Sequence, residues 1–359
     1  MVRINTGYIE DVMYGRRKSP LASAFLRVLS IPYCLAVFLR QALYAASILP
    51  RKKLKRRVIS VGNVTLGGTG KTPAVMNIAA VLLKNENRPL VVSRGYGRKN
   101  EADLVVVSDG KQVLVDAATG GDEPVLIGSR LAGVPVICGS DRYKAALFAL
   151  QEFDVDTVIL DDGFQHIRLL RNLDIVLVDA ADPFGNGRLF PAGILREPLA
   201  ALRRAQAILL TGVDRVADIE PLKRTISRIT KARIFTSRAV PADIVDVTTG
   251  EVRPLSALRG TQALAFAGIA RPSAFESQLR SLGAEVRAVF PYADHYAYKK
   301  SDLAGIFQRA ADEKVSFIIT TEKDAVRLRP LKPEGIWSLR IELKVVENEE
   351  WEAVLLKGI

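Results

Sequence analysis

The sequence predicts an α/β fold in which a parallel sheet is flanked by helices, with a smaller C-terminal α/β domain and an N-terminal membrane-associated helix. Three observations lead to this prediction. From residue 58 onward, short apolar runs alternate with helical stretches, a pattern typical of parallel strands joined by helices. A glycine-rich segment separates the first strand from the first helix of this series. Residues 1–57, which precede the first strand, are both basic and apolar. A chain of 359 residues also exceeds the usual single core.

The glycine-rich segment indicates a phosphate-binding loop of the P-loop NTPase type. Val58–Val61 should be a buried strand, and residues from Pro73 to Leu83 have helical apolar spacing. Loop amides and the helix N-terminus would bind phosphate, the lysine would reach the outer phosphates and the threonine hydroxyl would ligate magnesium. The usual spacing has glycine where this chain has Thr65, so the loop is a variant; the alternative is a structural turn. The residues concerned are Gly67, Gly68, Thr69, Gly70, Lys71 and Thr72.

Ligands of such sheets bind beyond the carboxyl ends of the strands, so the polar residues that follow the strands matter most. Arg94 follows the second strand, in a loop that could bind an anion or be a solvated basic turn, and Arg142 opens a helix where it could meet phosphate. Asp122 and Glu123 stand at a helix start, where acidic residues are often only caps. The predicted strands of this region are Val58–Val61, Leu90–Ser93, Leu104–Ser108, Val134–Cys138, Thr157–Leu160, Ile175–Val178 and Ala207–Leu210.

Paired carboxylates end one of these strands. Asp161 and Asp162 follow a buried run, and an acid at a strand end beside a P-loop is the usual second anchor for magnesium. Two adjacent carboxylates repel each other unless a cation or donors compensate; a structural turn is the alternative. The long loop 185–198 contributes Arg196 and Glu197 as candidates for the phosphate or metal site.

The N-terminal segment, residues 1–57, is predicted to contact an anionic membrane. It holds twelve Lys or Arg against Glu10 and Asp11, and so carries +10 of the net charge of +12. A basic segment on a nearly neutral body favours an anionic surface over a nucleic-acid groove. Residues 21–49 are apolar but interrupted by Arg27 and Arg40. An interfacial helix is favoured over a tilted span or a helix packed on the body.

The domain boundaries follow from these patterns. Residues 58–238 form the predicted P-loop core, 239–258 a β-hairpin connector and 259–359 a smaller α/β domain with strands at Ala263–Ala267, Val286–Phe290 and Phe317–Thr320. His295 follows a strand of that domain and is either a surface residue or a site residue. Cys34 and Cys138 provide neither a disulfide framework nor a metal-binding spacing.

The motifs, in this order, resemble the tetraacyldisaccharide 4′-kinase family of lipid A biosynthesis over nearly the whole chain. The segments that carry the resemblance are Gly62-Asn-Val-Thr-Leu-Gly-Gly-Thr-Gly-Lys-Thr-Pro73, Ser93-Arg-Gly-Tyr-Gly-Arg98, Gly121-Asp-Glu-Pro124, Asp161-Asp-Gly-Phe-Gln165, Leu195-Arg-Glu-Pro198, Phe266-Ala-Gly-Ile269, Asp294-His-Tyr296 and Thr321-Glu-Lys-Asp324.

The resemblance implies an ATP- and Mg²⁺-dependent kinase that phosphorylates the 4′-hydroxyl of an acylated glucosamine disaccharide 1-phosphate lipid and forms lipid IVA. It also implies a monotopic enzyme on the cytoplasmic face of the bacterial inner membrane. Asp122 would be the catalytic base, with His295 as its partner from the other domain, brought together by domain closure. The implied nucleotide-binding residues include Arg94, Glu123, Arg142, Gln165 and Arg196, and the implied metal ligands are Thr72, Asp161, Asp162 and Glu197.

Two other classes of protein remain open on the sequence. One is a P-loop GTPase or metal-insertion chaperone, although Thr211-Gly212-Val213-Asp214 is a poor guanine-recognition motif. The other is a membrane-bound ATPase without a lipid acceptor. The oligomeric state does not follow from the sequence.

Overall fold

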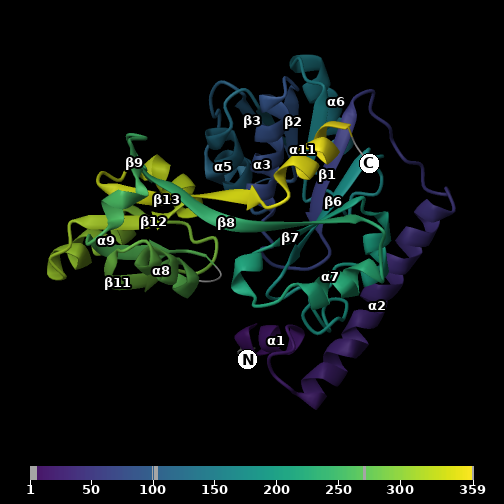
Figure 1. Ribbon diagram of the computed structural model, residues 1–359, viewed down its shortest axis with the longest axis horizontal. Coiled ribbons are helices and arrows are strands. Elements are labelled where there is room, and N and C mark those ends of the chain that lie inside the picture. The colour runs from purple at the N-terminus through teal and green to yellow at the C-terminus, as the bar shows by residue number, and fades with distance from the viewer. Residues whose placement is uncertain (1–5, 99, 101–103, 270–271, 358–359) are drawn as a thin grey trace. The chain divides into compact units, whose positions relative to one another are not determined.

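The computed structural model describes residues 6–98, 100, 104–269 and 272–357, so the first five residues of the predicted N-terminal segment lie outside the described residues. Contacts divide the chain into two compact units, which are described separately (Figure 1). The first unit contains Met1–Arg94, Asp141–Arg238 and Lys344–Ile359, and the second contains Gly95–Ser140 and Ala239–Leu343. The second unit therefore joins residues 95–140, which we assigned to the P-loop core, with the C-terminal region.

The first unit is built on a parallel sheet with the strand order β8-β7-β6-β1-β5-β2. Apart from β8, its strands are mostly apolar and buried on both faces, as expected for a parallel sheet covered by helices. They are β1 (Arg57–Asn63), β2 (Pro89–Ser93), β5 (Thr157–Asp161), β6 (Leu173–Asp179), β7 (Ala207–Thr211) and the first part of β8 (Arg233–Asp246).

Helices cover this sheet. Ala74, Val75, Ile78 and Leu82 of α3 are fully buried, and the Trp351 indole of α11 donates to Asn77 of α3 at 3.0 Å. Residues of η1 and α7 pack with side chains of β6 and β7 in a separate apolar cluster. The helices concerned are α3 (Lys71–Lys84), α6 (Arg142–Glu152), η1 (Leu199–Arg204), η2 (Val213–Arg215), α7 (Glu220–Ser227) and α11 (Asn348–Lys357).

The N-terminal segment folds into α1 (Thr6–Met13) and α2 (Pro20–Ala45). Figure 1 shows α2, in purple, as a long helix outside the sheet and helices of the first unit. Leu26 of α2 packs with Val12 of α1 and with Ile194 of the long loop. By length and composition alone α2 could cross a membrane, and it is the one such helix among the described residues.

The second unit is a smaller α/β arrangement. Its strands follow the order β11-β10-β12-β13 with each neighbouring pair parallel, and β3 pairs antiparallel with β4. Helix α8 packs on one apolar cluster of this sheet, and α9 and α10 pack on the other. The elements are β3 (Val105–Asp109), α4 (Ala117–Gly120), α5 (Asp122–Arg130), β4 (Pro135–Cys138), β9 (Val252–Pro254), η3 (Leu255–Leu258), β10 (Gln262–Ala267), α8 (Pro272–Ser281), β11 (Glu285–Pro291), α9 (Lys300–Asp312), β12 (Phe317–Thr321), α10 (Glu322–Leu328), η4 (Arg329–Leu331) and β13 (Ile336–Val345).

The predicted α/β fold is confirmed, and each predicted strand is observed with small shifts at its ends. The predicted hairpin is also present, since β9 pairs antiparallel with the end of β8. Two features differ from the prediction. β3 and β4 are antiparallel, as one pair of an otherwise parallel sheet often is. The long strand β8 was predicted only at its end, within the hairpin, and β13 was not predicted, because exposed and charged residues interrupt their apolar runs.

Candidate functional site

The phosphate-binding loop of the first unit has the strand, loop and helix that the sequence predicts. β1 ends at Asn63 and α3 begins at Lys71. Gly67 and Gly70 have φ values of 96° and 83°, which a residue with a Cβ adopts only at a cost. Gly70 is the N-cap of α3 and provides no side-chain capping bond, so the amides of the first helical turn remain available to an anion. A Cβ on Gly62 would lie 2.7 Å from the Cβ of Phe164, which explains glycine at that position.

The side chain of Lys71 lies between two oxygen atoms at the end of the sheet. Its Nζ is 3.5 Å from Asn63 Oδ1 and 3.7 Å from Asp162 Oδ1. Asn63 in turn donates to the Thr69 hydroxyl at 3.0 Å, and the Thr211 hydroxyl donates to the Thr69 carbonyl at 3.0 Å. These bonds hold the loop in place, and the Lys71 side chain stays partly exposed, at 12%.

The two carboxylates after β5 have different partners. Asp161 is buried and accepts a hydrogen bond from the Ser93 hydroxyl at 2.8 Å. Asp162 is in the left-handed region, with φ of 49°, and Arg196 Nη1 donates to both of its oxygens at 3.0 and 2.7 Å. Burial tends to raise the pKa of Asp162, but Lys71 and Arg196 outweigh it and hold that pKa below its ordinary value.

The long loop 185–198 is attached to the glycine-rich loop by backbone bonds. Thr65 and Leu195 form an antiparallel bridge, and the Arg196 amide donates to the Val64 carbonyl at 2.7 Å. This pairing sets Arg196 beside Asp162. Gln165 is also nearby, since its amide donates to the Asn63 carbonyl at 2.9 Å.

Glu197 is held differently from the other predicted metal ligands. It is fully buried, its Oε1 accepts from Arg40 at 3.3 Å, and its Oε2 accepts from Gln41 at 3.1 Å and Arg204 at 2.6 Å. Both oxygens are thus used by α2 and η1. Two arginines thus neutralise the carboxylate, and the role of Glu197 as a magnesium ligand stays a prediction.

The remaining predicted oxygen ligands suit a magnesium ion held jointly with nucleotide phosphates. Within the described part of the chain, no three His, Cys, Asp or Glu side chains are grouped so as to hold a metal ion by themselves. Magnesium is usually bound through one or two carboxylates together with phosphates. The Thr72 hydroxyl, which is buried at the start of α3, and the carboxylates of Asp161 and Asp162 provide the oxygen donors that this ion prefers.

Two predicted arginines lie at other positions of the first unit. Arg142 is buried at the first position of α6, after the N-cap Asp141, and its charge helps to lower the pKa of Asp162. Arg94 follows the last residue of β2 and is exposed. Both stay predictions as phosphate ligands.

In the second unit, Asp122 forms a compact cluster with His295 and Arg327. Asp122 Oδ2 accepts from Arg327 Nε at 2.7 Å and lies 3.0 Å from His295 Nδ1. Asp122 opens α5, but Gly121 is the N-cap and no side-chain capping bond is present. The carboxylate is therefore held by the arginine and the histidine, and the alternative of a simple helix cap does not describe it.

The pKa values of this pair shift in opposite directions. Burial tends to raise the pKa of Asp122, but the hydrogen bond with His295 and the Arg327 charge outweigh it and lower that pKa. The hydrogen bond to Asp122 raises the pKa of His295 despite partial burial of the ring. At neutral pH Asp122 is thus ionised and able to accept a hydrogen bond from a hydroxyl group.

Arg327 was not identified from the sequence, although it lies three residues after the Thr321-Glu-Lys-Asp324 motif. Its Nη1 donates to the Gly268 carbonyl at 3.1 Å and to Asp324 at 3.0 Å. Asp324 is fully buried and also accepts from the Tyr298 hydroxyl at 3.0 Å. The spacing of three along α10 was the available signal, since it places both side chains on one helix face.

We expected Asp122 and His295 to come from different domains, but both belong to the second unit. The reason is that α5 packs on α10, and two ion pairs join these helices. Glu123 pairs with Lys323 at 2.5 Å, and Arg130 pairs with Glu322. Glu123, a predicted nucleotide-binding residue, is thus engaged by Lys323.

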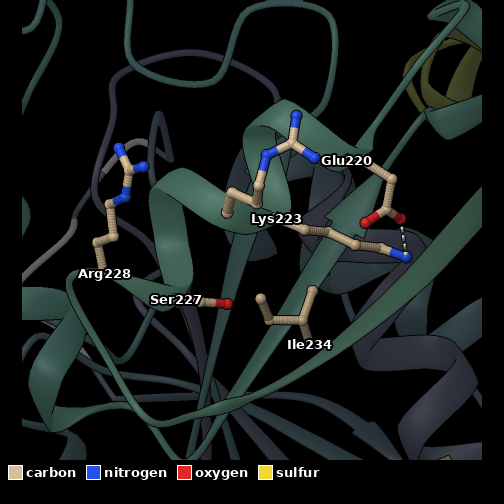
Figure 2. A pocket seen from close by; sticks show the side chains of 6 residues that line it. Glu220, Lys223, Ser227, Arg228 and Ile234 are labelled. Atoms are coloured by element: carbon tan, nitrogen blue, oxygen red, sulfur yellow. Dashed lines mark ion pairs between the residues drawn. The ribbon is translucent and has the colours of Figure 1, made fainter.

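A separate hollow of about 510 Å³ in the first unit contains none of these residues. Figure 2 shows its lining, in which Lys223 and Glu220 form an ion pair at 3.0 Å while Ser227 and Arg228 lie further along the rim. It is lined by α7 and by Ile234 of β8 and is not part of the candidate site.

Comparisons with known proteins agree with these motifs. Residues 22–359 match the family described as tetraacyldisaccharide-1-P 4′-kinase. A protein of Geobacter metallireducens named tetraacyldisaccharide 4′-kinase is 44% identical over 339 residues, which cover 94% of this chain and 98% of the relative. One of the same name from Syntrophus aciditrophicus is 40% identical over 359 residues, covering 97% and 96%.

A solved structure gives the same result. The crystal structure of LpxK from Aquifex aeolicus in complex with ATP has a TM-score of 0.78 and 31% identity to this chain, and the match covers 94% of this chain and 99% of that one. The shared fold extends over both units, and the glycine-rich loop and the Asp122 cluster lie within the matched family region. The chain therefore belongs to the tetraacyldisaccharide-1-P 4′-kinase family.

Proposed function

We propose that this protein is an ATP-dependent kinase that phosphorylates the 4′-hydroxyl of a tetraacylated glucosamine disaccharide 1-phosphate and so forms lipid IVA in lipid A biosynthesis. The observation that carries the proposal is the family match over residues 22–359, together with relatives of the same name over nearly the whole chain. That match also favours a kinase over a P-loop GTPase, a metal-insertion chaperone or an ATPase without a lipid acceptor.

The first unit would bind the nucleotide. The amides at the start of α3 and the Lys71 ammonium provide positive charge for the phosphates. Magnesium bound with the nucleotide by Thr72, Asp161 and Asp162 would neutralise charge on the outer phosphates. Arg196 balances the charge of Asp162, so that this carboxylate does not repel the phosphates.

Asp122 would accept the proton of the sugar hydroxyl. Its ionised carboxylate is held by Arg327 and His295 through Oδ2, which leaves Oδ1 for a substrate hydroxyl. A carboxylate of low pKa is a weak base, but phosphoryl transfer through a loose transition state makes little demand on base strength before the bond to phosphorus forms. Orientation of the hydroxyl is then the main contribution.

His295 would orient Asp122. Its ring is half-exposed, and its backbone is in the left-handed region with φ of 59°. For a residue other than glycine this conformation is uncommon and is often found at functional sites. The bond of the His295 amide to Asp294 Oδ1 at 3.1 Å stabilises the turn.

The N-terminal helices would hold the enzyme at the cytoplasmic face of the bacterial inner membrane, where its acylated substrate resides. The proposal is supported by the exposed apolar face of α2 and by the basic run Arg51–Arg57 that follows it. Deletion of residues 1–50 should abolish sedimentation with vesicles that contain phosphatidylglycerol; sedimentation equal to wild type would contradict an anchoring role.

Phosphate transfer to lipid tests the function directly. The purified protein is incubated with γ-labelled ATP and magnesium, with and without the disaccharide 1-phosphate lipid in detergent micelles. We expect label in the lipid product, and none when the 4′-hydroxyl of the lipid is blocked. Equal release of inorganic phosphate with and without lipid, and no labelled lipid, would identify an ATPase instead.

A further inference from the structure

Helix α2 has two different faces. A stripe at spacings of three and four residues turns toward the first unit, and it combines apolar with polar side chains. The stripe consists of Leu26, Ser30, Tyr33, Val37, Arg40 and Gln41. The rest of the helix surface is exposed and mostly apolar, with Arg27 as an exposed charged residue; its large apolar side chains are Phe25, Val28, Leu29, Ile31, Leu35, Phe38 and Leu39. An interfacial anchor requires only the second face, so the polar residues of the first need another explanation.

Three polar residues of the stripe contact two adjacent residues of the long loop, whereas the Ser30 hydroxyl donates to the Arg27 carbonyl of α2 itself at 2.8 Å. The Tyr33 hydroxyl donates to the Arg196 carbonyl at 2.8 Å. Arg40 and Gln41 donate to separate oxygens of Glu197, at 3.3 and 3.1 Å. Helix α2 thus contacts the backbone of one residue and the carboxylate of the next.

The carboxylate of Glu197 makes this contact energetically important. It is fully buried, and a buried charge that loses a partner is strongly destabilising. Arg204 of η1 provides one partner at 2.6 Å and Arg40 provides the second cation. Without Arg40, the loop conformation that buries Glu197 loses part of its electrostatic compensation.

The same loop carries the arginine of the phosphate site. The Arg196 guanidinium binds both oxygens of Asp162, and Asp162 lies 3.7 Å from Lys71 Nζ. A continuous series of contacts therefore leads from α2 through Arg196 to Lys71, within one compact unit.

We propose that α2 is a positioning element of the phosphate site, in addition to any role as an anchor. Arg40 is the main positioning residue: by neutralising Glu197 it fixes the loop that sets Arg196 against Asp162, and thereby the charge beside Lys71. This inference rests on the proposed kinase function for its kinetic test. It assigns Glu197 to the attachment of α2 and not to magnesium.

The test compares Arg40→Ala with Arg27→Ala. Both variants remove one positive charge from α2, but Arg27 is exposed and lies outside the stripe. Phosphate transfer to lipid is measured in detergent micelles, where attachment to a bilayer is not required. Arg40→Ala should lower kcat/KM on the order of tenfold to a hundredfold, since small displacements of positioning groups cost this much. Arg27→Ala should match wild type.

Three further measurements separate positioning from anchoring and from unfolding. Arg40→Ala should sediment like wild type with vesicles of phosphatidylethanolamine and phosphatidylglycerol, because the exposed apolar face is intact. Arg40→Lys should recover part of the lost activity, because it keeps the cation. Tyr33→Phe removes only the hydroxyl that donates to Arg196 and should cause a smaller kinetic loss in a folded protein.

Wild-type kcat and KM of Arg40→Ala in micelles would overturn the inference. If thermal melting shows that Arg40→Ala is unfolded at the assay temperature, Tyr33→Phe decides, and unchanged kinetics of that variant would overturn it equally. If the wild-type protein transfers no phosphate to lipid, the proposed function fails separately. The inference is then decided by the affinity of the protein for a fluorescent ATP analogue. Arg40→Ala should bind the analogue more weakly than wild type, and equal binding would overturn the inference.

Discussion

Arg327 holds two carboxylates at once, so its replacement by methionine should affect both stability and catalysis. Its side chain is 5% exposed and pairs with Asp122 at 2.7 Å and Asp324 at 3.0 Å. Removal of one partner from a buried ion pair typically costs about 3–5 kcal/mol. Methionine keeps most of the length of the side chain, so loss of packing adds little. We therefore expect a decrease of about 3–5 kcal/mol in the free energy of unfolding by urea.

The same variant should shift the acid limb of the kinase pH profile. Asp122 has a lowered pKa in the folded protein. This shift stabilises the folded protein at pH values above the pKa of Asp122 in the unfolded chain, and the stabilisation is lost as pH falls through the folded pKa. Without the Arg327 charge the folded pKa of Asp122 rises. Activity that requires the ionised carboxylate should then be lost at a higher pH than in wild type.

Arg309→Met is a matched control for this experiment. Arg309 belongs to the same unit and forms an exposed pair with Glu313 at 3.3 Å, which typically contributes less than about 1 kcal/mol. The argument that Arg327 sets the charge state of Asp122 would be refuted by two results together. Arg327→Met would unfold at the same urea concentration as Arg309→Met, and its kinase activity would fall at the same acid pH as in wild type.

The other predictions concern the glycine-rich loop of the first unit and the Asp122 cluster of the second. Lys71→Ala should reduce turnover by about a hundredfold or more in a folded protein, because the positive charge that stabilises the phosphates is lost. Near-normal turnover would contradict the P-loop assignment. Asp122→Ala and Asp122→Ala/His295→Ala should have similar turnover, because the histidine acts through the aspartate; losses that multiply would argue for a direct substrate contact of His295. The contact with Asp122 raises the pKa of His295 in the folded protein. The contribution of this contact to the free energy of unfolding is therefore complete below the pKa of His295 in the unfolded chain, and it is lost as pH rises through the folded pKa. Urea unfolding of His295→Gln should lack this pH dependence. Gly62→Ala should cost about 1–3 kcal/mol, because its Cβ would meet the backbone of Phe164 at 2.8 Å; an unchanged thermal midpoint would show that the site relaxes.

The sequence alone was sufficient to predict the phosphate-binding loop. An apolar strand, a run of glycines and a helix with Lys71 at its start are local features, and local sterics determine them. Most strands of both units were predictable because buried strands appear as continuous apolar runs, whereas β13 and most of β8, which exposed and charged residues interrupt, were not. The family resemblance supplied the proposed roles of Asp122 and His295, which no local pattern contains.

Only the tertiary structure decided which charged groups are partners. Glu197 is adjacent to Arg196 in sequence, yet one binds α2 and the other binds Asp162. Likewise, Asp122 meets Arg327 through the packing of α5 on α10. The contacts of Arg40 with Glu197 and of Asp122 with Arg327 join residues that are 157 and 205 positions apart in the chain. Periodicity and propensity describe only neighbours along the chain, whereas the charge and pKa of a buried carboxylate depend on what the folded chain brings within about 4 Å of it.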